Sequence, residues 1–503
     1  MVRCQRHVVV VLFVQHVLTP EGSRNIDRIC AVNYHISGME LMEHAARSAV
    51  DIILHHFPDR STILIACGSG NNGGDGFAMA HMLSDLHDVV VVTDAEPETL
   101  TPESRHHFEL ASKAVRFITF NELNEYPVED IDIIVDALIG AGGNATLRDP
   151  LPARLQQLNE IDAYRIAIDV PTGLDALRGE ADDQTFRADL TITMEGPKAG
   201  FFRGRGRDLV PRYEVAHIGA PAEVVEGEAL AHIIEESDIR RWLPQRLPET
   251  NKYSYGRVVV IAGSREMRGA GSLTAEAVLR SGAGLCILAT PSVHPLTPRE
   301  VITHVLPMHD DGSISETARE HLEQQLPRST VVAVGPGIGT NHRTLSMLAE
   351  LVNGMDPGVP VIIDADGLRI VPSLKRDMSH IVLTPHQGEF DRLIQQLDLG
   401  NVDGPGLAQH LGCVVHLKGS LSVTSDATET FWTVAGNPGM ATAGTGDVLT
   451  GIIAGFCAQG LSPLRAAALG SFIHGRSGDV AAQRSSQEFI TAGDVIRAMA
   501  DVL

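Results

Sequence analysis

The sequence NPGMATAGTGD (residues 437–447) is followed directly by an apolar segment that begins Val448-Leu449. Small residues before a helix allow backbone N–H groups to face an anion. Asp447 lies where this anion site would meet the helix, so it can accept a proton from a substrate hydroxyl. The stretch therefore predicts phosphoryl transfer to a hydroxyl. The alternative is that Asp447 only caps the helix and the glycines allow close packing.

Other polar segments follow predicted strands of the same half. KGSLS (residues 418–422) supplies a cation, hydroxyls and backbone donors, which suit the phosphate or ribose end of a nucleotide, although a strand-ending lysine in a polar turn is the alternative. LTPHQGE (383–389) and VGPGIG (334–339) also end strands, so they are expected at the same crevice rim. His386 alone is more often a structural residue than a ligand contact.

Short β-branched runs alternate with longer amphipathic stretches along the whole chain, which predicts parallel sheets covered by helices on both faces. A chain of 503 residues is too long for one ordinary core. The segment after residue 219 is rich in Ala, Glu and Gly and is followed by two prolines, which indicates a domain boundary. We expect an N-terminal domain over residues 1–225, a linker over 226–237 and a C-terminal domain over 238–503. Sequence does not define the role of the first eighteen residues.

A glycine-rich loop follows the first predicted strand of the N-terminal half. GSGNNG (residues 68–73) fits the dinucleotide fingerprint, and Asp94 ends the next strand. The continuation NNGGDG (71–76) instead places amides and a carboxylate where that fingerprint usually keeps small residues, and these groups suit sugar hydroxyls or a cation. In a third interpretation the glycines only form a tight turn and the asparagines cap the next helix.

Two further carboxylates, Asp136 and Asp169, end predicted strands of this half. Carboxyl ends of parallel strands line the ligand crevice of an open sheet. Each aspartate alone is more often a turn residue or a helix cap. Together with Asn72 they form a plausible oxygen cage.

Composition restricts the class of partner. The formal net charge of −23 would repel a phosphate backbone and an anionic membrane, so nucleic acid and membrane are not expected partners. The six cysteines are scattered without a CxxC pair, which indicates reduced thiols and a cytoplasmic location. The short apolar run after Met1 is interrupted by Gln15 and His16 and is not read as a signal peptide.

The blocks GSGNNGGDG, DALIGAGG, DVPTGLDA and EGPKAGF resemble the NAD(P)H-hydrate epimerase family. The resemblance implies a Rossmann-like three-layer domain that interconverts the R and S hydrates of NADH and NADPH and holds a potassium ion. It implies that Asn72, Asp136 and Thr172 hold the potassium. The residues implied to bind substrate are Asn71, Asn72, Gly73, Gly74, Asp75, Gly140, Ala141, Gly142, Gly143, Asn144, Ala145, Thr146 and Asp169. Asp169 is the expected catalytic acid/base, because the inversion requires a proton to be moved on and off, and Lys198 would assist electrostatically.

The second half, over about residues 238–503, resembles the ADP-dependent NAD(P)H-hydrate dehydratase family through NPGMATAGTGDVLTGIIAG and the strand-end segments above. This resemblance implies a ribokinase-like three-layer domain in which ADP phosphorylates the S hydrate and phosphate is then eliminated. It implies that Ala270, Gly337, His386 and Asp447 contact the hydrate, with Asp447 as catalytic base. The residues implied to contact the nucleotide are Lys418, Gly419, Ser420, Leu421, Ser422 and Gly446.

The joined interpretation is a bifunctional enzyme that repairs hydrated NADH and NADPH, with ADP as co-substrate, magnesium at the dehydratase site and a homo-oligomeric assembly. The alternative is a ribokinase-like kinase of a vitamin precursor or sugar, fused to a non-catalytic nucleotide-binding module. A third possibility takes GSGNNG as the fingerprint of a dehydrogenase.

Overall fold

The computed structural model describes residues 15–143 and 145–502. Asn144 and the residues before Gln15 lie outside the described part. The chain forms two compact units, one over Gln15–His232 and the other from Ile233 onward. The division falls inside residues 226–237, the segment predicted as a linker, which contains the end of α8 (Ala222–Gly227), β9 (Ala231–Ile233) and the start of α9 (Glu236–Trp242).

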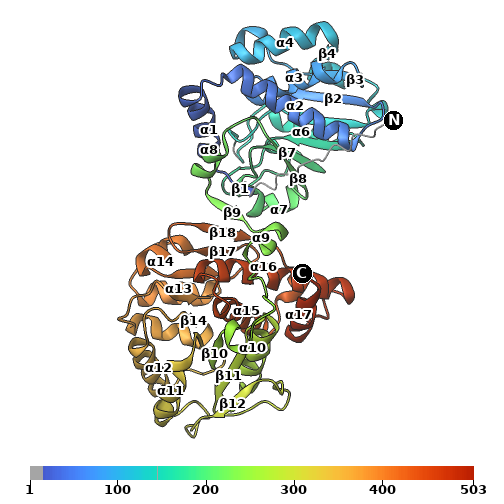
Figure 1. The fold of residues 1–503 in the computed structure, drawn as a ribbon. Coiled ribbons are helices and arrows are strands. Elements are labelled where there is room, and N and C mark those ends of the chain that lie inside the picture. Colours follow the sequence, from blue (N-terminus) through green and yellow to red (C-terminus); the bar gives the residue numbers. More distant parts are fainter. Residues whose placement is uncertain (1–14, 144, 503) are drawn as a thin grey trace, which may run out of the picture. The chain divides into compact units, whose positions relative to one another are not determined.

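The N-terminal unit is built on a wholly parallel sheet with the strand order β4-β3-β2-β5-β6-β7-β8 (Figure 1). The strands are β2 (Thr62–Cys67), β3 (Asp88–Val92), β4 (Arg116–Ile118), β5 (Ile133–Ala137), β6 (Tyr164–Ile168), β7 (Leu190–Met194) and β8 (Tyr213–Ala216), with the short β1 (Gln15–Val17) preceding them. The helices are α1 (Pro20–Asn33), α2 (Gly38–His56), α3 (Asn71–Leu83), α4 (Pro102–Ala114), α5 (Phe120–Leu123), α6 (Leu151–Glu160) and α7 (Gly206–Leu209).

Alternate residues of β2 belong to two different apolar cores, one on each face of the sheet. Ile63 and Ile65 pack with α2, α3 and α4, whereas Leu64 and Ala66 pack with α5 and α6. Side chains of a strand point alternately to opposite faces, so a continuous apolar run marks a strand that is buried on both faces. The three-layer α/β arrangement predicted from the sequence is confirmed.

The C-terminal unit contains a larger sheet in which β18-β17-β16-β15-β14-β13-β10-β11-β12 lie in this order. Its strands are β10 (Arg257–Ile261), β11 (Leu285–Thr290), β12 (Ile302–Val305), β13 (Val331–Val334), β14 (Val361–Ile363), β15 (Ile381–Leu383), β16 (Val414–Leu417), β17 (Ser422–Ser425) and β18 (Thr430–Thr433). The pairs from β12 to β16 are parallel. β17 pairs with β16 on one side and with β18 on the other, and both pairs are antiparallel.

Helices cover both faces of this sheet as well (Figure 1). The longer ones are α10 (Arg268–Arg280), α11 (Arg319–Gln325), α12 (His342–Gly354), α13 (Gln387–Gln396), α14 (Gly404–Leu411), α15 (Thr445–Ala458), α16 (Pro463–Arg484) and α17 (Ala492–Ala498). Val258 and Val260 of β10 pack against α10, α15, α16 and α17, whereas Val259 and Ile261 pack against α11 to α14. Sequence patterning misses the edge strands β8 and β12, because partly exposed strands lack a continuous apolar run.

Short 3₁₀ helices connect these elements. They are η1 (Pro97–Thr99), η2 (Val128–Asp130), η3 (Ala199–Phe202), η4 (Lys252–Tyr255), η5 (Glu316–Ala318), η6 (Leu326–Arg328), η7 (Ala365–Ser373), η8 (Pro438–Met440) and η9 (Met499–Asp501). Within the described ranges, no helix has both the length and the apolar character that crossing a membrane requires.

The turn between β2 and α3 depends on glycine at a position where two backbone segments touch. A Cβ atom on Gly73 would lie 1.9 Å from the carbonyl oxygen of Gly68, whereas a Cβ on Gly70 would meet nothing within 4 Å. We expect Gly73→Ala to lower the free energy of unfolding of the N-terminal unit by about 1–3 kcal/mol. Gly70→Ala is the matched control and should cost about 1 kcal/mol or less.

The two units can be followed separately during urea unfolding. Both tryptophans of the chain, Trp242 and Trp432, belong to the C-terminal unit, whereas far-ultraviolet circular dichroism reports both units. Gly73→Ala should shift the dichroism transition and leave the tryptophan transition in place. Equal transitions for the two alanine variants would show that the close backbone approach does not require glycine.

Candidate functional sites

The glycine-rich loop of the N-terminal unit joins β2 to the first turn of α3. Gly70 is the N-cap of α3 and no side chain caps this helix, so the interpretation of the asparagines as helix caps is wrong. Asn71 and Asn72 instead lie in the first turn. The backbone N–H groups of such a turn, together with the helix dipole, favour an anionic ligand.

The carboxylate that a dehydrogenase fingerprint would present to a ribose is engaged elsewhere. Asp94 forms an ion pair with Arg154 and accepts a hydrogen bond of 3.1 Å from the backbone N–H of Phe120. The geometry therefore gives no support to the dehydrogenase interpretation of GSGNNG.

Asp169 follows β6 and lines a cavity of about 730 Å³. Its φ of 65° is in the left-handed region. Lys198 Nζ lies 2.8 Å from Asp169 Oδ1, and the backbone N–H of Ala141 donates to Oδ2 at 2.9 Å. The Lys198 side chain is fully buried, and its ammonium also donates to Thr193 Oγ1 and to the carbonyl oxygens of Met194 and Gly196.

These contacts determine the charge of Asp169. Burial acts to raise the pKa of this carboxyl, but the charge and hydrogen bond of Lys198, with the backbone donors of Ala141 and Met194, outweigh it and hold the pKa below its ordinary value. Asp169 is therefore an ionised carboxylate at neutral pH and is competent to accept a proton. Lys198, predicted to assist electrostatically, lies in direct contact with it.

Of the three residues predicted to hold potassium, Asp136 and Thr172 are in direct contact, and Asn72 lines the cavity. Asp136 is fully buried and accepts hydrogen bonds from the backbone N–H and the hydroxyl of Thr172, each at 2.8 Å. Burial raises the pKa of Asp136 to about 6, although the Thr172 and Leu138 donors act against this rise. The Asn72 Nδ2 atom is buried without a hydrogen-bond partner, so the amide reversed about its axis would present an oxygen there.

This set of side chains fits a monovalent cation better than a transition metal. Hard cations prefer oxygen ligands, and Asp136, Thr172 and Asn72 supply a carboxylate, a hydroxyl and an amide. Among the described residues no group of three or more His, Cys, Asp or Glu side chains could hold a metal ion. A cation held by Asp136 would thus meet one carboxylate and otherwise neutral oxygens.

The cavity contacts only part of the predicted substrate-binding set. Asn71, Asn72, Asp75, Gly140, Ala141, Gly142 and Asp169 line it. Gly73, Gly74, Gly143, Ala145 and Thr146 do not line it, and Asn144 lies outside the described residues. Gly73 and Gly74 contribute through close packing, since a Cβ on Gly74 would lie 2.5 Å from Ser104 Oγ.

The cavity also contains acidic groups that sequence reasoning missed. Asp27 and Glu195 line it together with Asp75. Burial, with the negative charge of Asp169 second, raises the pKa of Asp27 to about 6 and raises that of Asp75 well above its ordinary value. No sequence signal marks Asp27, because it belongs to α1 and follows no strand.

The predicted catalytic loop of the C-terminal unit leads into α15. Gly444 is the N-cap, with a φ of 91°, and α15 begins at Thr445. Thr445 Oγ1 donates to the carbonyl oxygens of Met440 and Thr442, both at 3.0 Å, and so fixes the loop against the helix. Asp447 lies in the first turn and no side chain caps this helix, so the interpretation of Asp447 as a cap is wrong.

Asp447 has a proton affinity suited to acid/base chemistry at neutral pH. Burial raises its pKa to about 7, the charge of Asp364 contributes to the rise, and Lys418 opposes it. A general base is most effective when its pKa lies near the working pH. A carboxyl group with a pKa near 7 can exchange a proton at neutral pH.

Two of the predicted nucleotide-binding residues, Lys418 and Gly446, lie close to Asp447. Lys418 Nζ contacts Asp364 Oδ1 at 2.7 Å, and a Cβ on Gly446 would lie 3.3 Å from the same nitrogen. The backbone N–H of Gly419 donates to Ser422 Oγ at 3.4 Å, which closes the turn that also contains Ser420 and Leu421. Lys418 and Gly446 are thus neighbours although they are far apart in sequence.

The predicted hydrate contacts form two groups beyond the carboxyl ends of the strands, after β10, β13 and β15. A Cβ on Gly337 would lie 2.9 Å from the Cβ of Ala270, so these two residues touch. The backbone N–H of Lys418 donates to the carbonyl oxygen of Pro385, which brings His386 beside Lys418. His386 Nδ1 caps α13 by accepting from the backbone N–H groups of Gly388 and Glu389, and its ring is exposed.

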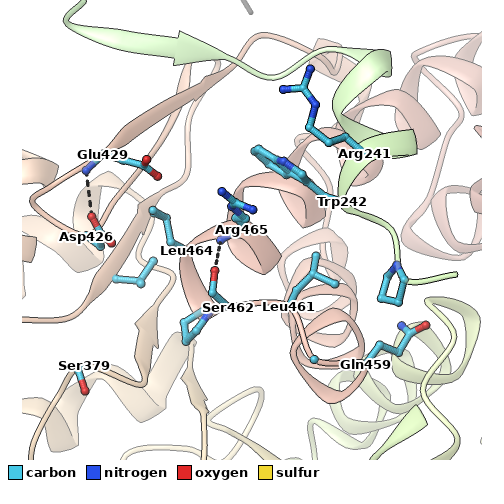
Figure 2. A pocket seen from close by; sticks show the side chains of 14 residues that line it. Arg241, Trp242, Ser379, Asp426, Glu429, Gln459, Leu461, Ser462, Leu464 and Arg465 are labelled. Atoms are coloured by element: carbon cyan, nitrogen blue, oxygen red, sulfur yellow. Dashed lines mark hydrogen bonds between the residues drawn. The ribbon is translucent and has the colours of Figure 1, made fainter. Parts of the chain in front are cut away.

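A second cavity of about 730 Å³ in the C-terminal unit contains none of the predicted site residues. Figure 2 shows Arg241, Trp242 and Arg465 on one side of it, with the Arg465 guanidinium 5.4 Å from the Trp242 ring centre. Val414, the first residue of β16, and Gln459, which follows α15, also line it. It thus lies at the amino ends of the strands, away from Asp447.

Fold and sites together define a two-domain α/β protein with a largely buried lysine–carboxylate pair in each domain. Residues 38–200 match the family model described as YjeF-related protein N-terminus, and residues 258–500 match the model described as NAD(P)H-hydrate dehydratase. The chain is 34% identical to the bifunctional NAD(P)H-hydrate repair enzyme Nnr of Moorella thermoacetica, over 96% of this chain and 95% of the relative. It belongs to the family of bifunctional NAD(P)H-hydrate repair enzymes.

Two further proteins show the same likeness. The Escherichia coli enzyme of the same name is 31% identical, over 91% of this chain and 88% of the relative. The solved structure of the ADP/ATP-dependent NAD(P)H-hydrate dehydratase from Bacillus subtilis, co-crystallised with ATP and Mg²⁺, is 27% identical and covers 53% of this chain and 96% of its own, with a TM-score of 0.45.

Replacing Asp169 and replacing Lys198 should lower the stability of the chain by different amounts. Asp169→Asn leaves a fully buried ammonium without its carboxylate and should cost about 3 kcal/mol of stability at neutral pH. Lys198→Met should cost less, because Asp169 is 16% exposed, keeps the Ala141 donor and can take up a proton. Urea unfolding followed by circular dichroism measures both, and equal costs would contradict this account of the pair.

Proposed function

We propose that this chain repairs hydrated NADH and NADPH in two steps. The N-terminal domain interconverts the R and S hydrates, and the C-terminal domain uses ADP to dehydrate the S form. The observation that carries the proposal is the presence of two differently tuned carboxylates in one chain: Asp169 is held ionised by Lys198, and Asp447 has a pKa of about 7. Family membership supports both halves.

In the N-terminal domain, the backbone N–H groups at the start of α3 are placed to bind a phosphate of the dinucleotide, while Asp169 faces the hydrated ring. Inversion at the hydroxyl-bearing carbon requires proton transfer, and Asp169 is the ionised group in the cavity that can accept the proton. Lys198 maintains that ionised state. Asn72, Asp136 and Thr172 would hold potassium, which would supply a fixed positive charge beside the substrate.

In the C-terminal domain, Asp447 accepts the proton of the ring hydroxyl as the hydroxyl oxygen attacks the β-phosphorus of ADP. A new O–P bond forms, the bond from that phosphorus to the bridging oxygen breaks, and AMP leaves. Lys418 and the backbone donors around Gly446 stabilise the negative charge that is transferred. The phosphorylated ring then loses inorganic phosphate as its C–O bond breaks and a proton leaves the adjacent carbon, which restores the ring double bond.

Several finer features belong to the same proposal. Ala270, Gly337 and His386 would contact the hydrate, and Gly419, Ser420, Leu421 and Ser422 would contact the nucleotide. Magnesium would accompany the nucleotide phosphates, as phosphoryl transfer commonly requires. ADP is proposed over ATP on the family resemblance, and parallel assays with each nucleotide test this choice. The homo-oligomeric state and the cytoplasmic location stay predictions.

Two single substitutions should separate the activities. With mixed R and S hydrates, ADP, magnesium and potassium, the wild-type chain should restore all the NADH absorbance. Asp169→Asn should convert the S fraction at a normal rate and leave only the slow uncatalysed conversion of the R fraction. Asp447→Asn should bind hydrate and ADP yet restore no NADH, because it removes the base but keeps the loop donors.

The activity of the unaltered domain shows in this assay that a variant has lost one activity and not both. Asp447→Asn should still epimerise pure R hydrate, which chromatography of the two forms can follow. Accumulation of a phosphorylated product without NADH would instead identify a small-molecule kinase. Full NADH recovery by Asp447→Asn would remove Asp447 from the mechanism.

The pKa of Asp447 predicts an acidic limit to dehydration. Asp447 must be deprotonated to accept the hydroxyl proton, so kcat/KM for the S hydrate should fall about tenfold for each pH unit below about 7. The epimerase rate depends on Asp169, whose pKa is lowered, so it should not share this midpoint. A dehydratase profile that stays flat down to pH 5 would contradict the proposed role of Asp447.

A further inference from the structure

Asp364, which no predicted role includes, occupies the centre of the dehydratase site. It follows β14 and its side chain is 2% exposed. Oδ1 receives Lys418 Nζ at 2.7 Å, and Oδ2 receives the hydroxyl of Thr450, also at 2.7 Å. One carboxylate therefore joins the end of β14, the end of β16 and the second turn of α15.

Two carboxylates compete for the single ammonium group of Lys418. Asp364 holds it through a direct ion pair, whereas among the described residues no hydrogen bond or ion pair reaches the Asp447 carboxylate. Lys418 nevertheless lies beside the first turn of α15, since a Cβ on Gly446 would lie 3.3 Å from its nitrogen and 3.9 Å from Asp364 Oδ2. Asp447 is thus near the ammonium without being neutralised by it.

Asp364 and Lys418 are the main charged groups near the first turn of α15, because the other groups packed around it are neutral. His416 on β16 and His474 on α16 are buried and neutral, because burial lowers their pKa values to about 3 and about 4. From α10 and α17 the loop receives apolar contacts, with Leu273 and Ala492 beside Gly444. β10 and β13 present only apolar side chains to α15.

We propose that Asp364 is a positioning residue, which holds Lys418 beside Gly446 and anchors α15 through Thr450, so that Asp447 stays unpaired and free to take the substrate proton. This inference rests on the proposed dehydratase function. Without Asp364, the ammonium would be released to Asp447, which would then be a more acidic and weaker base. Burial alone would not keep Asp447 near neutrality, because an adjacent opposite charge favours the ionised form.

Asp364→Asn tests this proposal with little change of shape. It should move the acidic limb of the kcat/KM profile to lower pH by about one unit or more, because an unpaired Lys418 stabilises ionised Asp447. The plateau rate should fall at the same time, since the base is weaker. Thr450→Val is the matched control: it removes one hydroxyl partner of Asp364 without changing charge, so it should lower the rate and leave the limb in place.

A direct titration separates this inference from the proposed function. The pKa of Asp447 can be read by ¹³C NMR of the full chain labelled at aspartate carboxyls, with Asp447→Asn used to assign the signal. Asp364→Asn should lower this pKa and Lys418→Met should raise it. These opposite shifts would support the inference even if no variant, nor the wild type, dehydrated the hydrate.

Two results would overturn the inference. The first is an unchanged Asp447 titration in folded Asp364→Asn, even with dehydratase activity intact in the wild type. The second is an equal loss of rate at every pH in Asp364→Asn and Thr450→Val, which would reduce Asp364 to a purely structural role. If Asp364→Asn fails to fold, Lys418→Met decides alone, and a lowered or unchanged Asp447 pKa in that variant overturns the inference.

Discussion

A lysine ammonium removed from water needs a carboxylate, and each half of this chain meets that requirement in a different way. In the N-terminal unit the partner of Lys198 is Asp169, the carboxylate proposed to be catalytic, and the pair lowers its pKa. In the C-terminal unit the partner of Lys418 is Asp364, so the Asp447 carboxylate proposed to be catalytic has no ion pair, and burial raises its pKa to about 7. The same pair of residue types thus favours the ionised form of the proposed catalytic group in one site and leaves that group titrating near neutrality in the other.

The parallel sheets explain why chemistry gathers where it does. Strand ends of a parallel sheet lie at one edge, so residues distant in sequence, such as Asp364 and Lys418, become neighbours. Glycines at this edge have no side chain, so the space beside them stays open for neighbouring groups. Gly446 leaves room for the Lys418 ammonium, and Gly140 leaves room for the Asp169 and Asn72 side chains.

The parts of this structure that depend on local pattern could be predicted from the sequence. The short β-branched runs form the strands of two largely parallel sheets, and the loops before α3 and α15 have the predicted places. The predicted alternatives about helix caps failed because capping depends on side-chain direction, which spacing does not define. Asp27 could not be assigned, because it lies on a helix and only tertiary packing brings it to the cavity. Asp364 follows β14 and so had the same strand-end signal as Asp136 and Asp169, but its contact with Lys418 depends on tertiary packing.

The left-handed backbone at Asp169 has an evolutionary consequence. A φ of 65° at a residue other than glycine costs the folded state about 1 kcal/mol or more, and here the conformation aims a carboxylate into the cavity. Selection for stability alone would favour glycine or asparagine at this position, with an apolar replacement of Lys198 to match. In a lineage that obtained its epimerase from another gene, the carboxylate at residue 169 would no longer be needed and its cost to stability would decide. Residue 169 should then be among the first positions in the N-terminal domain to be substituted.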